Sequence, residues 1–326
     1  MVQSRPLTFA DRPGSAHSHA DTTKVLSTRL EIVPTDGIVA IVQANIPVAS
    51  TLTITCLPHH GIEPTMQTAV ELGLLGFNVV PHLAARSLEG RAQLAGILRG
   101  CEAVGITEVF AVGGDAAHAA GPYDSAVGLM VDIAEMSGGR IAIGVAGHPE
   151  GHPKQNPLHM LDALLEKQHL AANIVTQMCF SAAKIGWYAE LLRREGVELP
   201  LWAGVAGAVP RTQLVSLAIK IGVGPSLRFL SGKGPLARRL LSGGAYSSQG
   251  LVSELSAIQP ALAGIHLYTF NNLGPSSAKV GNGPGSVRPT GRRNQEDADG
   301  TPAHGRVTAV DLGTQPLIPE LRAPES

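Results

Sequence analysis

The chain has 326 residues, of which 44% are hydrophobic and 16% charged. It can therefore bury a sizeable core and is not disordered throughout. Its formal net charge of −1 argues against a general affinity for nucleic acid or for an anionic membrane surface. The length suits one (β/α)₈ barrel, which usually takes about 250 residues, with extensions at its ends.

The cysteines and the N-terminus favour a cytoplasmic protein. Cys56, Cys101 and Cys179 lie far apart and form no CxxC pair, as is usual in a reducing compartment. The first residues contain no basic start followed by an apolar run, so we expect no signal peptide. No stretch approaches the roughly 20 apolar residues that span a bilayer, so we expect no membrane contact.

Both ends differ in composition from the middle of the chain. Residues 1–25 are polar and show no helical or strand period, which predicts a flexible N-terminal extension. Residues 274–326 are rich in Gly, Pro, Ser and charge, and they have too little apolar area to offset the entropy of ordering. We therefore predict a disordered tail there and a catalytic domain over 26–273.

Eight short apolar runs follow one another through this domain. Most are continuous rather than alternating, which is typical of parallel strands buried on both faces. The predicted strands are 28–33, 51–56, 77–83, 107–114, 140–147, 172–177, 199–205 and 264–270.

The segments between these strands carry apolar residues at helical spacing, most clearly in 91–103, 124–136 and 182–195. Ser181 is suited to be the N-cap of the last of these helices, and Gly105 to end the first. Strands alternating with helices eight times predict a closed (β/α)₈ TIM barrel.

Two further points concern the fold. The longest connection, 206–263, predicts extra helices before the last strand. A doubly wound open sheet is the alternative fold, but its glycine fingerprint is missing after the first strand, where IVPTDG stands.

Barrel enzymes place their active site at the carboxyl ends of the strands, so polar residues at these ends are informative. The sequence has more of them than a packed interior needs. They are Glu31, Thr55, His82, Asp115, Gln177 and Tyr268.

Two of these residues are carboxylates with different contexts. Glu31 lies within the apolar run LEIVP, where a carboxylate is costly unless it is paired or near water. It suits a general acid, and a structural ion pair is the alternative. Asp115 follows Gly113-Gly114, which allow a ligand to approach the backbone closely, and an N-cap is its alternative role.

The string GHPEGHP over 147–153 predicts a loop of defined shape, because each Pro fixes its backbone angle φ and each Gly allows backbone angles that other residues rarely adopt. His148, Glu150 and His152 are possible metal ligands, but the prolines break the helix that would align a His pair, so we expect no metal site. The amide of Gln177 can donate and accept at a polar ring edge, or bond to backbone. The absence of GxxxxGK[ST], CxxC and GxSxG patterns excludes several common enzyme classes.

The order of these strings along residues 28–273 resembles the methylenetetrahydrofolate reductase family. In this chain LEIVPTD is similar to the family's E-F-F-P-P strand, and ITCLP takes the place of its V-T-Y-G string. Likewise PHLAA is similar to the family's P/A-H-L-T-C string, and AVGGD is similar to its A-L-R-G-D string. Further along, HPEGHP is similar to Y-P-E-x-H-P, VTQMCF to I-T-Q-x-x-F, WAGVAGAVP to P-G-I-x-P, and HLYTFN to H-F-Y-T-L-N.

The resemblance implies a flavoprotein oxidoreductase of one-carbon metabolism and methionine biosynthesis. Such an enzyme reduces 5,10-methylenetetrahydrofolate to 5-methyltetrahydrofolate with hydride from NADH or NADPH, passed through bound FAD. By resemblance Glu31 is the general acid, and Asp115 is a catalytic residue that also binds the tetrahydrofolate substrate. Gln177, Phe180 and Tyr268 are the other substrate-binding residues that it implies.

The resemblance also implies a set of FAD contacts, namely Thr55, His82, Gly114, Ala146, His148, His152, Asp162 and Lys167. Two departures concern this cofactor. Gly113 stands where the family has arginine, and His148 where it has an aromatic residue. Loss of a charge-assisted hydrogen bond from arginine costs about 1.5–3 kcal/mol.

Two alternatives therefore stay open. One is a flavin-independent or altered-substrate enzyme for folates or methyl groups on the same barrel, and the other is a non-catalytic folate-binding barrel. The sequence also leaves open the direction of the reaction, the choice between NADH and NADPH, and the oligomeric state, a homo-oligomer included.

Overall fold

The computed structural model describes residues 26–58, 61–151, 156–209, 246–259 and 261–274. Every described residue lies in one unit of the chain, within residues 1–286. The predicted N-terminal extension lies outside the described residues, as does the predicted tail apart from Gly274. Both therefore stay predictions.

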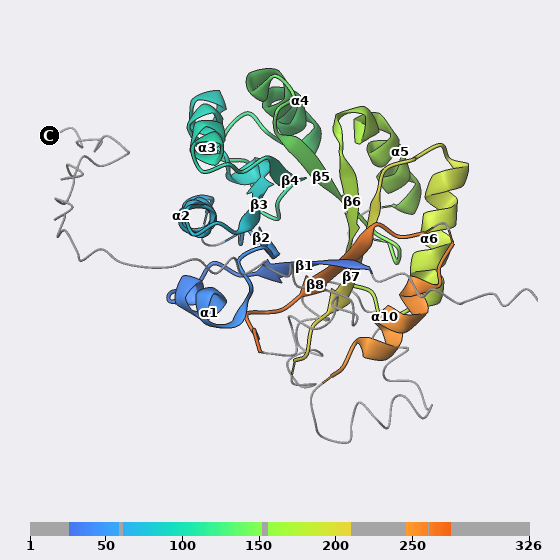
Figure 1. The fold of residues 1–326 in the computed structure, drawn as a ribbon. Helices are drawn as coiled ribbons and strands as arrows, with labels where there is room; N and C mark the ends of the chain where they lie inside the picture. Colours follow the sequence, from blue (N-terminus) through green and yellow to red (C-terminus); the bar gives the residue numbers. More distant parts are fainter. Residues whose placement is uncertain (1–25, 59–60, 152–155, 210–245, 260, 275–326) are drawn as a thin grey trace, which may run out of the picture. The chain divides into compact units, whose positions relative to one another are not determined.

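Eight parallel strands pair in chain order and close into a barrel, with helices around it (Figure 1). The strands are β1 (Ser27–Ile32), β2 (Thr51–Ile54), β3 (Asn78–Ala84), β4 (Glu108–Val112), β5 (Ala142–Gly147), β6 (Asn173–Thr176), β7 (Leu201–Ala206) and β8 (Gly264–Tyr268). Because β1 pairs with both β2 and β8, the sheet has no edge. The predicted TIM barrel is confirmed, and the doubly wound alternative is wrong.

The helices follow the strands. They are α1 (Ile38–Asn45), α2 (Glu63–Leu74), η1 (Ala85–Ser87), α3 (Arg91–Ala103), α4 (Ala126–Ser137), α5 (Pro157–Lys167), η2 (Gln168–Leu170), α6 (Ala182–Arg194) and α10 (Gln249–Ser256). Ser181 caps α6 as predicted, since its hydroxyl accepts a hydrogen bond from the amide of Lys184 at 3.4 Å. Of the predicted extra helices before the last strand, α10 is described, and residues 210–245 lie outside the described part.

The outward side chains of the strands form the main core with the helices, as Ile32, Leu52 and Val109 illustrate. The inward side chains form a second, smaller cluster around Val80, Phe110 and Val175. This division follows from the alternation of side chains along each strand, and it leaves one inward row per strand to shape the barrel interior.

The N-terminal end of the interior is filled by Arg29, Glu108, Asn173 and Trp202, which we call the N-terminal cluster. The guanidinium of Arg29 donates to both oxygens of Glu108 at 2.7 and 3.1 Å and lies 4.0 Å over the Trp202 ring. The amide of Asn173 donates to Glu108 at 2.8 Å. These side chains occupy the space at the strand starts, and both oxygens of Glu108 accept hydrogen bonds there, although Oδ1 of Asn173 is buried without a partner among the described residues.

Aromatic rings in the interior pack over glycines on the neighbouring strands. Phe110 pairs in register with Gly144, and Trp202 with Gly264. A Cβ atom at Gly144 would lie 2.8 Å from the Phe110 ring. The missing side chains therefore make room for rings that a barrel of this width could not otherwise contain.

No helix in the described ranges is long and apolar enough to cross a membrane.

Replacing Gly264 by alanine tests this packing. The new Cβ would lie 2.5 Å from the carbonyl oxygen of Ser27 and nearer still to the Trp202 ring. We expect the free energy of unfolding, measured by guanidinium denaturation, to fall by about 1–3 kcal/mol, as is usual for overpacking. Gly100→Ala on α3 is the control. Nothing lies within 4 Å of its added Cβ, so we expect a gain of about 0.5–1 kcal/mol. Equal losses in both variants would contradict the argument.

Candidate active site

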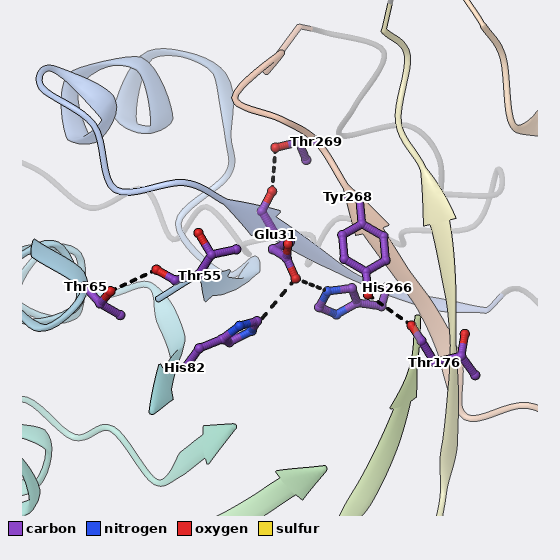
Figure 2. A network of polar contacts seen from close by, with 8 residues as sticks. All are labelled: Glu31, Thr55, Thr65, His82, Thr176, His266, Tyr268 and Thr269. Atoms are coloured by element: carbon purple, nitrogen blue, oxygen red, sulfur yellow. Dashed lines mark hydrogen bonds and ion pairs between the residues drawn. The ribbon is translucent and has the colours of Figure 1, made fainter. Parts of the chain in front are cut away.

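Three polar side chains meet inside the barrel, from β1, β3 and β8. The Nε2 atom of His266 lies 2.8 Å from Oε2 of Glu31, and Nε2 of His82 lies 3.8 Å from the same oxygen. Figure 2 shows both rings directed at the Glu31 carboxylate. The carboxylate that sequence analysis placed in an apolar strand therefore has two histidine neighbours rather than an arginine or lysine.

Strand geometry explains why these groups face one another. Glu31 follows Arg29 by two residues, so both point inward. The β1–β8 register places Arg29 opposite His266 and Glu31 opposite Tyr268. His266 is thus the diagonal neighbour of Glu31 on the inner face, within reach of its longer side chain.

His82 is a neutral, buried ring. Burial lowers the pKa of His82 to about 4, and the nearby Glu31 carboxylate raises it only in part. Its ring also packs at 4.7 Å from that of Phe110. The 3.8 Å separation from Glu31 is therefore not an ion pair near neutral pH, and Nε2 of His82 has no hydrogen-bond partner within the described part of the chain. It offers an unused polar atom to the interior.

The segment after β8 holds the backbone of Glu31. The hydroxyl of Thr269 donates to the Glu31 carbonyl at 2.5 Å, and its amide does so at 3.2 Å. The side chain of Asn271 accepts from the amide of Val33 at 2.8 Å and donates to its carbonyl at 2.9 Å. Phe270 and Asn271 adopt left-handed backbone angles, with φ of 52° and 61°, which turn the chain back toward β1.

Tyr268 and Phe180, both predicted to bind substrate, come together in one apolar cluster with Met178 and Ala206. The Tyr268 hydroxyl donates to the carbonyl of Thr176 at 3.0 Å. Burial raises the pKa of Tyr268 well above its usual value, so this hydroxyl stays protonated. The two rings supply an apolar wall on the β6–β8 side of the interior.

Thr55, predicted to contact FAD, follows β2. Its carbonyl accepts a hydrogen bond from the hydroxyl of Thr65 at 2.8 Å, which ties it to α2. Its own hydroxyl is buried and has no partner among the residues that the structure describes. The β2–β3 register pairs Ile54 with Pro81 and so places Thr55 next to His82, and both residues are labelled in Figure 2.

Gln177 and the turn after β5 lie side by side. The backbone amide of Gln177 donates to the carbonyl of Gly147 at 2.7 Å. Ala146 of β5 pairs in register with Val175 of β6. His148 begins a tight turn, because its carbonyl accepts from the amide of Gly151 at 3.1 Å. His152, a predicted cofactor contact, lies outside the described residues.

Glu150, within the same turn, is bonded to the start of α6. Its carboxylate accepts from Sγ of Cys179 at 3.2 Å and lies 3.3 Å from Nζ of Lys184. Burial raises the pKa of the Cys179 thiol to about 12, so it stays protonated and can donate. Glu150 therefore fixes the turn on α6. Across the described ranges, no group of three His, Cys, Asp or Glu side chains is arranged to hold a metal ion.

Asp115 and Gly114 are exposed on the loop after β4, and Arg86 supports this loop. The Arg86 guanidinium donates to the carbonyls of Ala116 and Ala117, both at 2.7 Å, and its amide donates to the carbonyl of Gly113 at 3.0 Å. Sequence analysis missed Arg86, because a lone arginine after a strand looks like any solvated charge.

Asp162 and Lys167, the remaining predicted cofactor contacts, lie on α5. Asp162 is exposed, and Lys167 ends the helix shortly before β6 begins. A helix between parallel strands runs opposite to them, so Lys167 lies toward the N-terminal end of the barrel. Burial lowers the pKa of Lys167. The structure does not bring these two residues together with Glu31.

His266 is the other functional candidate that sequence analysis missed. It stands in the apolar run GIHLYTF and is only 2% exposed. Its spacing of two from Tyr268 was the available signal, since both must then share the inner face of the strand.

The lowered pKa of His82 predicts a pH dependence of stability. The unfolded ring binds a proton near pH 6.5 and the folded ring near pH 4, so between these values the unfolded state holds more protons. Stability is therefore complete above pH 6.5 and falls by roughly 3 kcal/mol as the pH drops to 4. Denaturant unfolding of the wild type and of His82→Leu over this range checks it, because the variant should lose that slope. An identical slope in both proteins would refute the assignment.

Arg86→Ala tests the support of the Asp115 loop. The carbonyls of Ala116, Ala117 and Asp124 would lose their donor in the guanidinium, so we expect amide hydrogen exchange over residues 113–124 to accelerate at least about tenfold while the barrel strands stay protected. Arg99→Ala on α3 is the matched control, since that arginine is exposed and far from the loop in sequence. Unchanged exchange in the loop would show that Arg86 does not support it.

Comparison with known proteins gives one family and several distant structures. The family model for methylenetetrahydrofolate reductase matches residues 64–218. This stretch contains His82, Asp115, Gln177 and Phe180, whereas Glu31 and Tyr268 lie outside it.

Among solved structures, the chain is similar to 2,3-dimethylmalate lyase, a PEP mutase/isocitrate lyase superfamily member, at 12% identity and a TM-score of 0.47, covering 78% of this chain and 80% of that one. A putative lyase/mutase from Burkholderia cenocepacia matches at 13% identity and 0.44, covering 78% of each chain. The Ruminococcus gnavus sialic acid aldolase matches at 10% and 0.39, covering 60% and 65%. Because these TM-scores are below 0.5, the barrel rests on its own strand pairing.

The family match bears out the resemblance first drawn from short strings at the strand ends. The family model of methylenetetrahydrofolate reductase matches this chain over residues 64–218, which are 155 of its 326 residues.

Proposed function

We propose that the protein interconverts 5,10-methylenetetrahydrofolate and 5-methyltetrahydrofolate, with NADH or NADPH as the source of hydride and FAD as the bound carrier. The observation that carries the proposal is the Glu31 carboxylate inside the barrel, 13% exposed and 2.8 Å from His266, in a chain whose residues 64–218 match the family model. One-carbon metabolism in the cytoplasm, including methionine biosynthesis, would be the setting of such an enzyme.

Glu31 would act as the general acid. Protonation of the bridge nitrogen opens the methylene bridge of the substrate to an electrophilic iminium, which can then accept hydride. A carboxyl group that is mostly buried but still reaches solvent can deliver such a proton and be reloaded from water. The N-terminal cluster closes the far end of the interior, which supports an approach of the substrate from the carboxyl ends of the strands.

Four residues would bind the folate. Phe180 and Tyr268 supply apolar ring faces, and the amide of Gln177 can donate and accept at the pterin edge. Asp115 would bind the pterin from its exposed loop, whose conformation depends on Arg86.

The residues present fit the ring of FAD better than its phosphates. The unpartnered Thr55 hydroxyl and His82 Nε2 could hydrogen-bond a flavin ring, and the small side chain of Ala146 packs against the interior cluster of Val80, Phe110 and Val175. Toward the phosphates, Gly113 has no charge and Lys167 lies near the other end of the barrel, so neither supplies a cation there. FAD, when bound, would carry the hydride.

A second candidate follows from this mismatch, namely hydride transfer directly from the nicotinamide on the same barrel, or an altered folate or methyl donor. The near-ultraviolet and visible absorption spectrum of the purified protein separates the two. Flavin released by heat at about one per chain supports the flavoprotein. A colourless protein that FAD does not reconstitute, yet that oxidises NADH or NADPH with the folate, supports the second candidate.

Glu31→Gln tests the general acid. An amide cannot release a proton, so we expect kcat to fall about 10²–10⁴-fold while the Kd for the folate changes less than about threefold. Steady-state reduction of 5,10-methylenetetrahydrofolate and calorimetric titration measure the two quantities. Glu71→Gln on α2, at an exposed position, is the matched control and should leave both unchanged.

The same pair of measurements tests the non-catalytic alternative. A wild type that binds the folate but turns over neither substrate, with binding unaffected by Glu31→Gln, would replace the enzyme by a folate-binding barrel.

A further inference from the structure

We propose that His266 is a positioning residue for Glu31, whose Nε2–H group holds one carboxyl oxygen so that the other oxygen carries the transferable proton. The inference deepens the proposed function and rests on it for its catalytic meaning. The contact itself stands on the structure, since the sequence analysis included His266 only as the first residue of the string HLYTFN and gave it no role.

One strand holds both parts of Glu31. The side chain of His266, on β8, lies 2.8 Å from Oε2 of Glu31, and the Thr269 hydroxyl, just beyond β8, donates to the Glu31 carbonyl. The His266 ring is 2% exposed and packs edge-on against Tyr268 at 4.9 Å, so it cannot swing away from the carboxylate. Glu31 is therefore held at its main chain and at its carboxylate from the same direction.

The other ring nitrogen indicates the tautomer. Nδ1 of His266 is buried and has no hydrogen-bond partner in the described part of the chain. A buried N–H group without an acceptor is rarer in proteins than an acceptor without a donor. When the ring carries a single N–H hydrogen, that hydrogen therefore lies on Nε2 and is donated to Oε2 of Glu31.

This arrangement determines how the proton moves. With Oε2 accepting from His266, a protonated Glu31 carries its hydrogen on Oε1. On transfer, the Oε1–H bond breaks, the proton goes to the lone pair of the bridge nitrogen, and the bonding electrons remain on the carboxylate. The Nε2–H···Oε2 bond persists and becomes charge-assisted, which stabilises the product carboxylate. His266 gains and loses no proton, and water reloads Glu31.

The other titratable groups facing Glu31 do not compete for this role. His82, from β3, is neutral with a pKa of about 4, and its Nε2 lies 3.8 Å away, beyond hydrogen-bond distance. Tyr268, from β8, has its pKa raised by burial and donates its hydroxyl hydrogen to Thr176. Among the described residues that face Glu31, His266 is thus the one that donates to its carboxylate.

The pH dependence of kcat tests the inference in three purified full-length variants. His266→Leu removes the donor, His266→Gln places an amide N–H within reach of Oε2, and His169→Gln alters an exposed histidine on η2. A general acid must be protonated, so activity falls as the pH rises. Without the donor the carboxylate forms less readily, so the alkaline limb of His266→Leu should move upward by about one pH unit.

The expected amplitudes separate positioning from folding. His266→Leu should lower kcat about 10²-fold and change the KM for folate less than about threefold. His266→Gln should restore the alkaline limb of the kcat profile to its wild-type pH. His169→Gln should have the kcat and the pH profile of the wild type. If His266→Leu does not fold by circular dichroism, His266→Asn, whose amide is too short to reach Oε2, takes its place. An unmoved limb in a folded donor-less variant overturns the inference.

A second readout does not depend on activity. Nitrogen-15 NMR of the imidazoles should show His266 as the Nε2–H tautomer, and Glu31→Leu should abolish that preference. An inactive wild type with this tautomer would contradict the proposed function but still support the hydrogen bond between His266 and Glu31. The Nδ1–H tautomer in an active wild type would overturn the inference alone.

Discussion

The pairing of β1 with β8 is the contact on which the barrel and its candidate site both depend. It removes the last sheet edge, and its register places His266 diagonally across from Glu31. Beyond the strands, Thr269 and Asn271 continue the same junction by bonding to the backbone of Glu31 and Val33. Glu31, whose carboxylate would be costly in an apolar strand, is thereby held by hydrogen bonds to its side chain and its backbone, so the closure of the barrel and the position of this carboxylate depend on the same strand pairing.

The interior changes character along the barrel axis, and this gradient suits a site open at one end. At the strand starts Arg29 donates to both oxygens of Glu108, beside the buried and unpartnered Oδ1 of Asn173, and in the middle aromatic rings pack over inward glycines such as Gly144. Toward the carboxyl ends, the hydroxyl of Thr55 and Nε2 of His82 are buried without partners among the described residues. Satisfied groups give rigidity, whereas unsatisfied ones are where a ligand can complete the hydrogen bonding.

Two loops near the candidate site are each held by the side chain of one charged residue. Arg86 bonds to carbonyls of the loop that carries Asp115, and Glu150 joins the turn after β5 to α6 through Cys179 and Lys184. Neither residue needs to touch a ligand to matter, because a displaced loop would misplace the polar groups that do. Gly113, which stands where the resembled family has arginine, lies next to the same loop. Whether the protein binds FAD therefore depends in part on this region.

The sequence by itself determined the alternation of strands and helices, the identity of Glu31 as an inward carboxylate candidate, and the family strings around His82, Asp115 and Gln177, because these depend on local period and strand ends. Only the tertiary structure decided that His266 bonds to Glu31, that Arg86 supports the Asp115 loop, and that Lys167 lies toward the other end of the barrel. Such relations join residues up to 235 positions apart. They are set by register and by the direction of each helix around the closed sheet, and no local pattern carries that information.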